Sequence, residues 1–300
     1  MNKILFLRSD KALLPEIEVY IEYFNRTSDF VGCDSSVLGD ECDMDDFDII
    51  WEFKGFGGNK SDHHIIVQEY ASLSTGVFPK IKNTMKTILN PKPDLRIFLN
   101  EEVKKGFKFN DNIKSCYRDM GIRKEFLNVR NKKKEYDFIY IGAISKDRKI
   151  DKLLYNINKT KCGKICLVGE PEIDIYKKYK YNSNIIFTGK VAHREIPNIA
   201  SKAIYGINYI PNKYPYNIQT STKLLEYLTL GLKVITTDYK WIRDFEQRHN
   251  CSFYKLTNMN FSIKSIEKHV FRSEFNAEDF LWDNILENSG ILSSLRNLIN

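Results

Sequence analysis

Short runs of consecutive apolar residues alternate with segments of helical periodicity along most of this chain of 300 residues. Uninterrupted apolar runs are typical of strands that are buried on both faces of a parallel sheet. In the first part of the chain we expect strands at residues 3–7, 48–52, 64–68 and 95–99, and helices at residues 14–24 and 77–89. This spacing predicts βαβ units, and therefore a parallel sheet covered by helices.

The same alternation begins again after residues 129–136, a charged stretch without periodicity that we expect to be a linker. Beyond it we expect strands at residues 137–141, 164–168, 184–188, 205–210 and 233–237, and helices at 148–157, 173–179, 194–202, 221–230, 241–248 and 277–298. We therefore predict an α/β fold of two Rossmann-like domains that face each other across a cleft. The predicted divisions are residues 1–132, residues 133–275 and a C-terminal helix in residues 276–300.

The composition agrees with a globular protein of about two domains. Hydrophobic residues make up 42% and charged residues 28% of the sequence, which excludes a largely disordered chain. No apolar run approaches the roughly 18 residues that span a bilayer, and the first segment becomes charged too soon for a signal peptide. The six cysteines are scattered, so we expect reduced thiols and a cytoplasmic protein.

The net charge of +7 is unevenly distributed along the chain. Residues 1–79 carry a net charge of −9, residues 80–134 carry +10 and residues 135–300 carry +6. The basic segment 80–134 also contains interleaved phenylalanines, so it could face an anionic inner-leaflet membrane surface, or it could be a solvated lysine-rich surface. We expect no nucleic acid partner, because no nucleic-acid-binding pattern is found.

The stretch TSTKLLEYLTLGLKVITTD at residues 220–238 carries the strongest chemical signal. It opens with Thr220, Ser221 and Thr222, which are residue types that cap helix N-termini. A helix beginning there offers backbone N–H groups and the positive end of its dipole to an anion such as a diphosphate. Lys223 adds a positive charge, and Glu226 follows one turn later, within reach of ribose hydroxyls. The alternative is a well-capped surface helix with a solvated Glu226.

Residues 221–238 resemble the donor-binding segment of GT-B glycosyltransferases, in particular those of family 4, which combine a Lys and a Glu-Tyr pair on a helix with a following Gly-x-x-Val-Ile. The resemblance extends to YIGAISKDRKIDKLL (140–154), ICLVGEP (165–171) and IIFTGKVAHREIPNIASKA (185–203), and it is looser in the first half of the chain. It implies a GT-B fold whose last helix, which contains Trp282, crosses back onto the N-terminal domain. It also implies a nucleotide-sugar donor and catalysis without a metal or other cofactor.

The resemblance implies roles for residues at matching positions. Two of the three basic residues Lys146, Arg148 and Lys149 would neutralise the diphosphate as it leaves, and we expect Lys146 and Arg148 to be catalytic in this sense. Glu226 would bind the ribose. The expected donor-binding residues are Gly142, Lys149, Gly189, Lys190, Val191, Asn217, Gln219, Ser221, Thr222, Lys223 and Glu226.

The sequence departs from the family pattern at one position of the donor site. Many members carry a second Glu eight residues before the ribose Glu, and this chain has Ile218 there. Contacts to the donor sugar must then come from Asn217, Gln219 or the backbone. The identity of the sugar and the retaining outcome therefore depend on the resemblance alone.

In the first half of the chain, Glu69 follows a predicted strand and is a candidate catalytic base for an inverting reaction; the alternative is a structural, salt-bridged Glu. The loop 54–60 is not a GxGxxG fingerprint, which argues against a nicotinamide dehydrogenase.

Asp43 and Asp45 form a DxD pattern within an acidic run, and the histidines show no metal-ligand spacing, so we expect no metal site. His193 opens a predicted helix near the cleft.

We therefore expect a glycosyltransferase that moves a sugar from a nucleotide-diphosphate sugar, with UDP favoured, to a glycan or lipid-linked acceptor of a surface polysaccharide or lipopolysaccharide. The alternatives are an inverting transferase, a nucleotide-sugar epimerase, a non-catalytic scaffold with this fold, and a basic lipid-binding protein.

Overall fold

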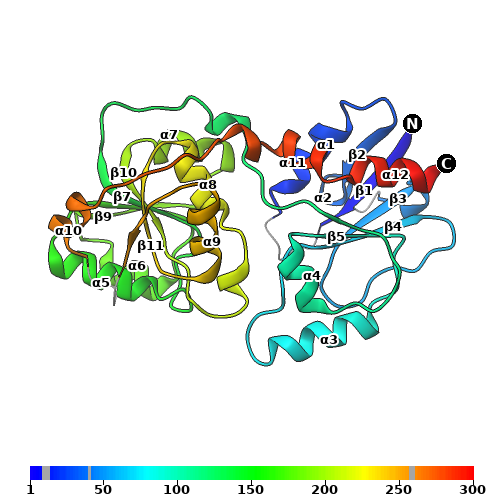
Figure 1. Cartoon of the computed structure of the whole chain (residues 1–300), viewed down its shortest axis with the longest axis horizontal. Coiled ribbons are helices and arrows are strands. Elements are labelled where there is room, and N and C mark those ends of the chain that lie inside the picture. Colours follow the sequence, from blue (N-terminus) through cyan, green and yellow to red (C-terminus); the bar gives the residue numbers. More distant parts are fainter. Residues whose placement is uncertain (9–13, 40–41, 257–260) are drawn as a thin grey trace. The chain divides into compact units, whose positions relative to one another are not determined.

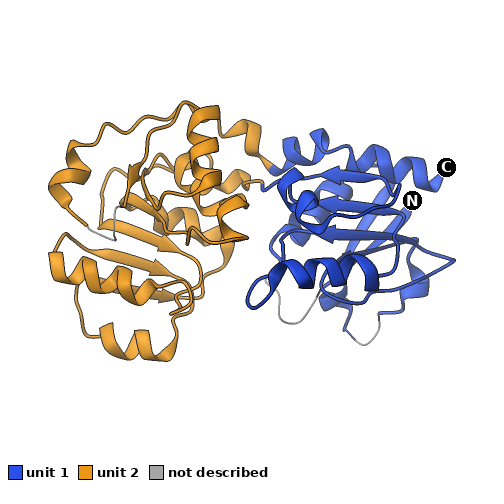
Figure 2. Cartoon of the chain, turned by 60° about the horizontal axis from the view of Figure 1, so that its bottom comes forward, with its two compact units in different colours: residues 1–120, 282–300 blue, residues 121–281 orange. Residues whose placement is uncertain are grey.

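The computed structural model describes residues 1–8, 14–39, 42–256 and 261–300, and the strands in these residues form two parallel sheets of six strands each (Figure 1). The chain divides into two compact units (Figure 2). Unit 1 consists of Met1–Met120 and Trp282–Asn300, and unit 2 consists of Gly121–Leu281. The predicted α/β fold of two Rossmann-like domains is confirmed at this level. The boundaries expected near residues 132 and 275 both fall inside unit 2.

Unit 1 is built on a sheet with the strand order β2-β1-β3-β4-β5-β6, in which every neighbouring pair is parallel. The strands are β1 (Asn2–Leu7), β2 (Phe30–Asp34), β3 (Ile49–Phe53), β4 (Ile65–Tyr70), β5 (Leu95–Phe98) and β6 (Ser115–Tyr117). The helices are α1 (Glu16–Phe24), α2 (Ser35–Leu38), η2 (Met44–Asp46), α3 (Pro79–Leu89), α4 (Glu101–Phe107), α11 (Trp282–Asn288) and α12 (Ile291–Ile299). The strands β2 and β6 were not among the expected elements.

The C-terminal segment does not form the single helix that its periodicity predicts. It folds as η6 (Glu278–Phe280), α11 and α12, because Gly290 has a φ of +71° and turns the chain between the last two helices. Trp282, at the start of α11, packs edge-on against Tyr20 of α1 and lies under the Arg118 guanidinium. The end of the chain thus joins the core of unit 1, as the resemblance implied.

Unit 2 repeats the parallel arrangement with the strand order β12-β11-β10-β7-β8-β9. Its strands are β7 (Tyr136–Ile141), β8 (Ile165–Val168), β9 (Ile185–Gly189), β10 (Ala203–Asn208), β11 (Lys233–Thr236) and β12 (Tyr254–Lys255). Its helices are η3 (Lys124–Phe126), α5 (Ile150–Thr160), α6 (Ile173–Tyr179), η4 (His193–Glu195), α7 (Ile196–Ala200), η5 (Tyr216–Ile218), α8 (Thr222–Thr229), α9 (Lys240–Arg248) and α10 (Ile263–Lys268), followed by η6.

The core of unit 2 explains why helix α8 lies where it does. Leu224, Leu225 and Tyr227 are buried on its inner face. Gly206 of β10 leaves room for the Tyr227 ring, since a Cβ at that position would lie 2.5 Å from the ring carbons. The Tyr227 hydroxyl accepts a hydrogen bond of 3.0 Å from the backbone N–H of Ile141. These contacts fix the helix against the carboxyl end of β7, where parallel sheets bind ligands.

No helix in the described residues is long and apolar enough to cross a bilayer.

Candidate functional site

The start of α8 differs from the expected capping pattern. Ser221 is the N-cap residue, but its side chain accepts no hydrogen bond from the first turn. Its hydroxyl instead donates to Oδ1 of Asn208 at the end of β10, at 2.8 Å. The first backbone N–H groups of a helix have no intrahelical acceptor, so α8 presents uncapped donors and a positive dipole end. Thr222, the first residue of the helix, is half-buried beside this end.

Lys223 places its ammonium group next to an aromatic ring instead of a carboxylate. The Nζ atom lies 4.4 Å from the centre of the Tyr140 ring of β7. Gly142 follows this strand with a φ of +133°, and a Cβ there would come within 3.6 Å of the same Nζ. Burial lowers the pKa of Lys223 to about 7; the charge of Arg148 acts in the same direction and Glu226 opposes it. Within the described residues, Lys223 forms no ion pair.

Arg148 is the second cation of this site. Its guanidinium lies 5.1 Å from the centre of the Tyr216 ring of η5, and no carboxylate in the described part of the chain pairs with it. Its charge is strong enough at Lys223 to help lower that residue's pKa. Two neighbouring basic side chains, neither of which forms an ion pair within the described residues, form a site that an anion would stabilise.

The other two basic residues of this loop are placed differently. Lys146 is exposed and forms an ion pair of 2.5 Å with Asp174 of α6. Lys149 is exposed, is the N-cap residue of α5 and has a φ of 54°. Of the three residues that the sequence left as alternatives, the structure therefore brings Arg148 into electrostatic contact with Lys223.

Glu226 is nearly buried on α8, with a side chain that is 4% exposed, and it does not project into solvent as the alternative interpretation required. Its Oε1 atom lies 2.7 Å from Nε2 of His193, the first residue of η4. The sequence marked His193 only by its place near the cleft, and no pattern indicated that Glu226 would be its partner. The two residues lie far apart in the chain and meet because η4 leads into α7, and α7 and α8 both pack against β10.

Several polar side-chain atoms near this edge of unit 2 lack partners. In the part of the chain that the structure describes, six buried side-chain N or O atoms have no hydrogen-bond partner, and three belong to unit 2: His193 Nδ1, Asn217 Oδ1 and Gln219 Nε2. Buried polar groups are normally satisfied, so unsatisfied atoms indicate a missing polar partner. Asn217 and Gln219 are the residues expected to contact the donor sugar.

Glycines at the strand ends allow close backbone approach. Gly169 follows β8 with a φ of +141°, and a Cβ there would lie 2.2 Å from the carbonyl oxygen of Gly142. Gly189 ends β9 with a φ of +71°, and no atom lies within 4 Å of the place where its Cβ would be. Lys190 is exposed and Val191 half-buried in the segment that follows. This open backbone is where the resemblance puts contacts to the base.

Glu69 of unit 1 has surroundings that contradict its expected place as a cleft-lining base. It is 1% exposed, in the core. Arg118 pairs with it at 2.5 Å, and the Trp51 indole N–H and the Tyr20 hydroxyl donate to it at 2.9 and 3.2 Å. Burial raises the pKa of Glu69, while Arg118 lowers it. These partners support the structural alternative for Glu69, because its ion pair and its hydrogen bonds are made with buried residues of the core.

The described residues contain no group of three or more His, Cys, Asp or Glu side chains that could hold a metal ion. Asp43 of the DxD pattern accepts a hydrogen bond from the Asp45 backbone N–H and caps η2.

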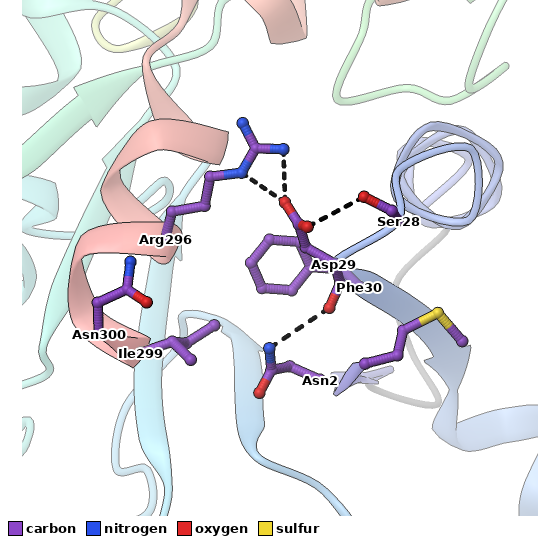
Figure 3. A pocket seen from close by; sticks show the side chains of 8 residues that line it. Asn2, Ser28, Asp29, Phe30, Arg296, Ile299 and Asn300 are labelled. Carbon is purple, nitrogen blue, oxygen red and sulfur yellow. Dashed lines mark hydrogen bonds and ion pairs between the residues drawn. The ribbon is translucent and has the colours of Figure 1, made fainter.

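A pocket of about 520 Å³ lies in unit 1 near the amino ends of β1 and β2. There Arg296 of α12 forms an ion pair of 2.5 Å with Asp29, which holds α12 against the sheet (Figure 3). The pocket lies at the amino ends of the strands, whereas parallel sheets bind ligands at the carboxyl ends.

No family model and no curated protein matches the sequence. Solved structures match its fold. Sucrose-phosphate synthase from Thermosynechococcus elongatus has a TM-score of 0.70 at 10% identity, with 100% of both chains covered. Anabaena HepE, solved with UDP and glucose, has a TM-score of 0.60 at 12% identity, covering 100% of this chain and 98% of HepE.

A UDP-GlcNAc 2-epimerase from Methanocaldococcus jannaschii, solved with UDP-GlcNAc and UDP, has a TM-score of 0.54 at 12% identity, covering 96% of this chain and 99% of the epimerase. At these identities the likeness concerns the fold. The chain therefore has the GT-B fold, which transferases and epimerases of nucleotide sugars share.

Proposed function

We propose that this protein binds a nucleoside-diphosphate sugar on unit 2 and transfers the sugar to an acceptor. The observation that carries the proposal is the pair of basic side chains, Lys223 and Arg148, which form no ion pair within the described residues and lie beside the uncapped start of α8. A diphosphate supplies the two negative groups that this arrangement lacks. Its oxygens would accept hydrogen bonds from the first N–H groups of α8.

The same groups support a catalytic role. Charge accumulates on the diphosphate as the bond to the sugar breaks, so fixed cations and helix N–H groups stabilise the transition state more than the bound donor. In this proposal Arg148 and Lys223 supply that stabilisation without a metal ion, and Lys146 lies further out with Asp174. Glu226 binds the ribose, and Asn217 and Gln219 direct their unsatisfied amide atoms to the donor sugar.

UDP is the favoured nucleotide in this proposal. HepE was solved with UDP and glucose, and the epimerase with UDP-GlcNAc and UDP. A retaining outcome, as in family 4, and an acceptor belonging to a surface polysaccharide or lipopolysaccharide complete the proposal. Both are inferred from the resemblance of residues 137–240 to that family.

A surface of unit 1 supports a lipid-linked acceptor. Helix α3 carries a row of exposed apolar residues at helical spacing: Phe78 just before it, then Ile81, Met85, Ile88 and Leu89. Ile81 and Ile88 are 57% and 74% exposed. Lysines 80 and 92 beside this row are also exposed. Apolar residues flanked by lysines are typical of helices that lie in the interface of an anionic bilayer.

A second candidate function is epimerisation of a nucleotide sugar, which the likeness to the epimerase favours.

The experiment that tests both functions incubates the protein in EDTA with UDP-glucose, UDP-GlcNAc and GDP-mannose, each with a soluble oligosaccharide or a polyprenyl-linked sugar as acceptor. NMR of the sugar protons then follows the products. A new glycosidic bond that requires the acceptor supports transfer, and its anomeric configuration identifies retention or inversion. Inversion at C2 without an acceptor supports epimerisation, and no turnover with any donor contradicts both.

A further inference from the structure

The Glu226 carboxylate has a single side-chain partner in the described part of the chain. That partner is His193, whose Nε2 lies 2.7 Å from Oε1. The Glu226 side chain is 4% exposed and the His193 side chain is 30% exposed. A carboxylate so nearly withdrawn from water needs hydrogen-bond donors to compensate for lost hydration. His193 is therefore the side chain that satisfies and orients this carboxylate.

The surroundings of the imidazole determine where its proton lies. Nε2 faces a carboxylate oxygen, which accepts and does not donate, so Nε2 carries the proton. Nδ1 is buried and has no hydrogen-bond partner among the residues that the structure describes. A proton on Nδ1 would leave a buried N–H without an acceptor, which disfavours that tautomer. The hydrogen-bond network thus favours the tautomer of His193 that carries its proton on Nε2 and donates it to Glu226.

The imidazole ring is also held in place by packing. The ring centre lies 5.4 Å from the ring centre of Phe126, which is completely buried at the end of η3. The ring therefore packs against Phe126 while its Nε2 atom meets the carboxylate. Such a donor restricts the carboxylate to one orientation before a ligand arrives, which lowers the cost of ordering it on binding.

We infer that His193 is a positioning residue that orients Glu226 so that its second oxygen accepts hydrogen bonds from the ribose hydroxyls of a bound nucleotide. The inference rests on the proposed function and adds to it a residue outside the expected site. It assigns recognition of a ribonucleotide over its deoxy form to the pair His193 and Glu226, because only the ribose hydroxyls use the oriented oxygen.

The test measures binding by calorimetry in EDTA, using UDP or GDP, whichever the wild type binds more tightly, and its 2′,3′-dideoxy form. His193→Phe keeps a ring against Phe126 but removes the donor, and His193→Gln returns an N–H near the position of Nε2. We expect His193→Phe to weaken binding of the ribonucleotide about tenfold, as for loss of a hydrogen bond that orients a charged group. Binding of the dideoxy form should change little, and His193→Gln should recover most of the loss.

Three results would overturn the inference. Equal weakening of the ribo and dideoxy forms by His193→Phe would indicate general damage to the fold. Unchanged affinity in both variants, with Glu226→Gln still weakening the ribonucleotide selectively, would remove His193 but leave the proposed function. Binding of neither UDP nor GDP to the wild type would remove the proposed function as well, so the two failures are distinguishable.

Discussion

The ammonium group of Lys223 lies 4.4 Å from the centre of the Tyr140 ring, and in the described residues no carboxylate pairs with it. An aromatic face attracts a cation more weakly than a carboxylate does. The protein thus holds a lysine whose pKa is about 7 at the start of a helix, close to a second cation, Arg148. This combination is unfavourable by itself and becomes favourable when an anion binds.

The first prediction concerns the pH dependence of this lysine. Burial lowers the pKa of Lys223 to about 7, so this side chain is largely neutral above that pH. A bound diphosphate favours the charged form and raises the pKa, so binding must take up a proton. Affinity for UDP should therefore fall as the pH rises from about 7 to about 9. Calorimetry in buffers with different ionisation enthalpies measures the proton uptake directly.

The control for this prediction is Lys223→Met, which keeps a long apolar side chain over Tyr140 and cannot titrate. We expect this variant to bind UDP more weakly and to lose the proton uptake at about pH 8. Proton uptake that persists unchanged in Lys223→Met would assign the titration to another group and contradict the prediction.

The second prediction concerns close approach of two strand ends. A Cβ on Gly169 would lie 2.2 Å from the Gly142 carbonyl oxygen, whereas one on Gly189 meets no atom within 4 Å. Both glycines have positive φ angles that other residues rarely adopt, so each alanine carries a conformational cost of about 1–3 kcal/mol. Gly169→Ala should lower the free energy of unfolding of unit 2 by clearly more than Gly189→Ala does, as measured in urea. Equal losses of unfolding free energy in the two variants would contradict this prediction, because they would show that the backbone around Gly142 moves aside without cost.

The third prediction tests the structural role of the buried charges of unit 1. The Arg118 guanidinium is completely buried and pairs with Glu69 at 2.5 Å and with Glu16 at 3.1 Å. Removing one partner of a buried ion pair leaves uncompensated charge, at a cost of about 3–5 kcal/mol. Arg118→Met should therefore destabilise unit 1 by about that amount.

The matched control is Arg26→Met, which removes an exposed ion pair with Asp283. Such pairs contribute about 0–1 kcal/mol, so this variant should unfold almost like the wild type. A stable Arg118→Met protein would show that the cluster contributes nothing to folding, and it would reopen a different role for Glu69.

The fourth prediction concerns the exposed apolar row of α3. Ile81→Asp and Ile88→Asp place a negative charge among Phe78, Met85 and Leu89. If this row lies in the interface of an anionic bilayer, each substitution should reduce co-sedimentation with vesicles containing anionic lipid. Ile173→Asp, at a residue of unit 2 that is 62% exposed, is the control and should bind like the wild type. Equal binding of all variants, or no binding of the wild type at low salt, would contradict the membrane proposal.

The sequence predicts the fold well because buried parallel strands have a strong signature, and it misses β2, β6 and β12 for physical reasons. β6 and β12 are too short to show a pattern, and β2 has Gly32 at its centre and ends in Asp34, so its sequence resembles a loop. The predicted C-terminal helix is interrupted at Gly290, where a positive φ ends one helix and begins another. Apolar periodicity continues across that break, so the pattern does not reveal it.

The candidate site was predictable to the extent that it lies in one stretch of sequence. The segment with Lys223 and Glu226 could be identified as a candidate site from its resemblance to the donor-binding segment of GT-B glycosyltransferases, whereas the residues alone left a capped surface helix as an equal alternative. The partners of Lys223 and Glu226 could not be identified, since Tyr140 lies on β7 and His193 in η4, and both meet them only in the folded unit. Glu69 illustrates the same limit, because the residue that neutralises it, Arg118, lies on a distant segment.

The measurement that tests the central claim most directly is calorimetric titration with UDP and GDP, in EDTA and low salt, of the wild type, the double variant Arg148→Met/Lys223→Met and the control Lys146→Met. We predict that the wild type binds one of the two nucleotides, that the double variant binds it at least about a hundredfold more weakly, and that Lys146→Met stays within a few-fold of the wild type. The account would be contradicted if the wild type bound neither nucleotide, or if the double variant bound as tightly as the wild type.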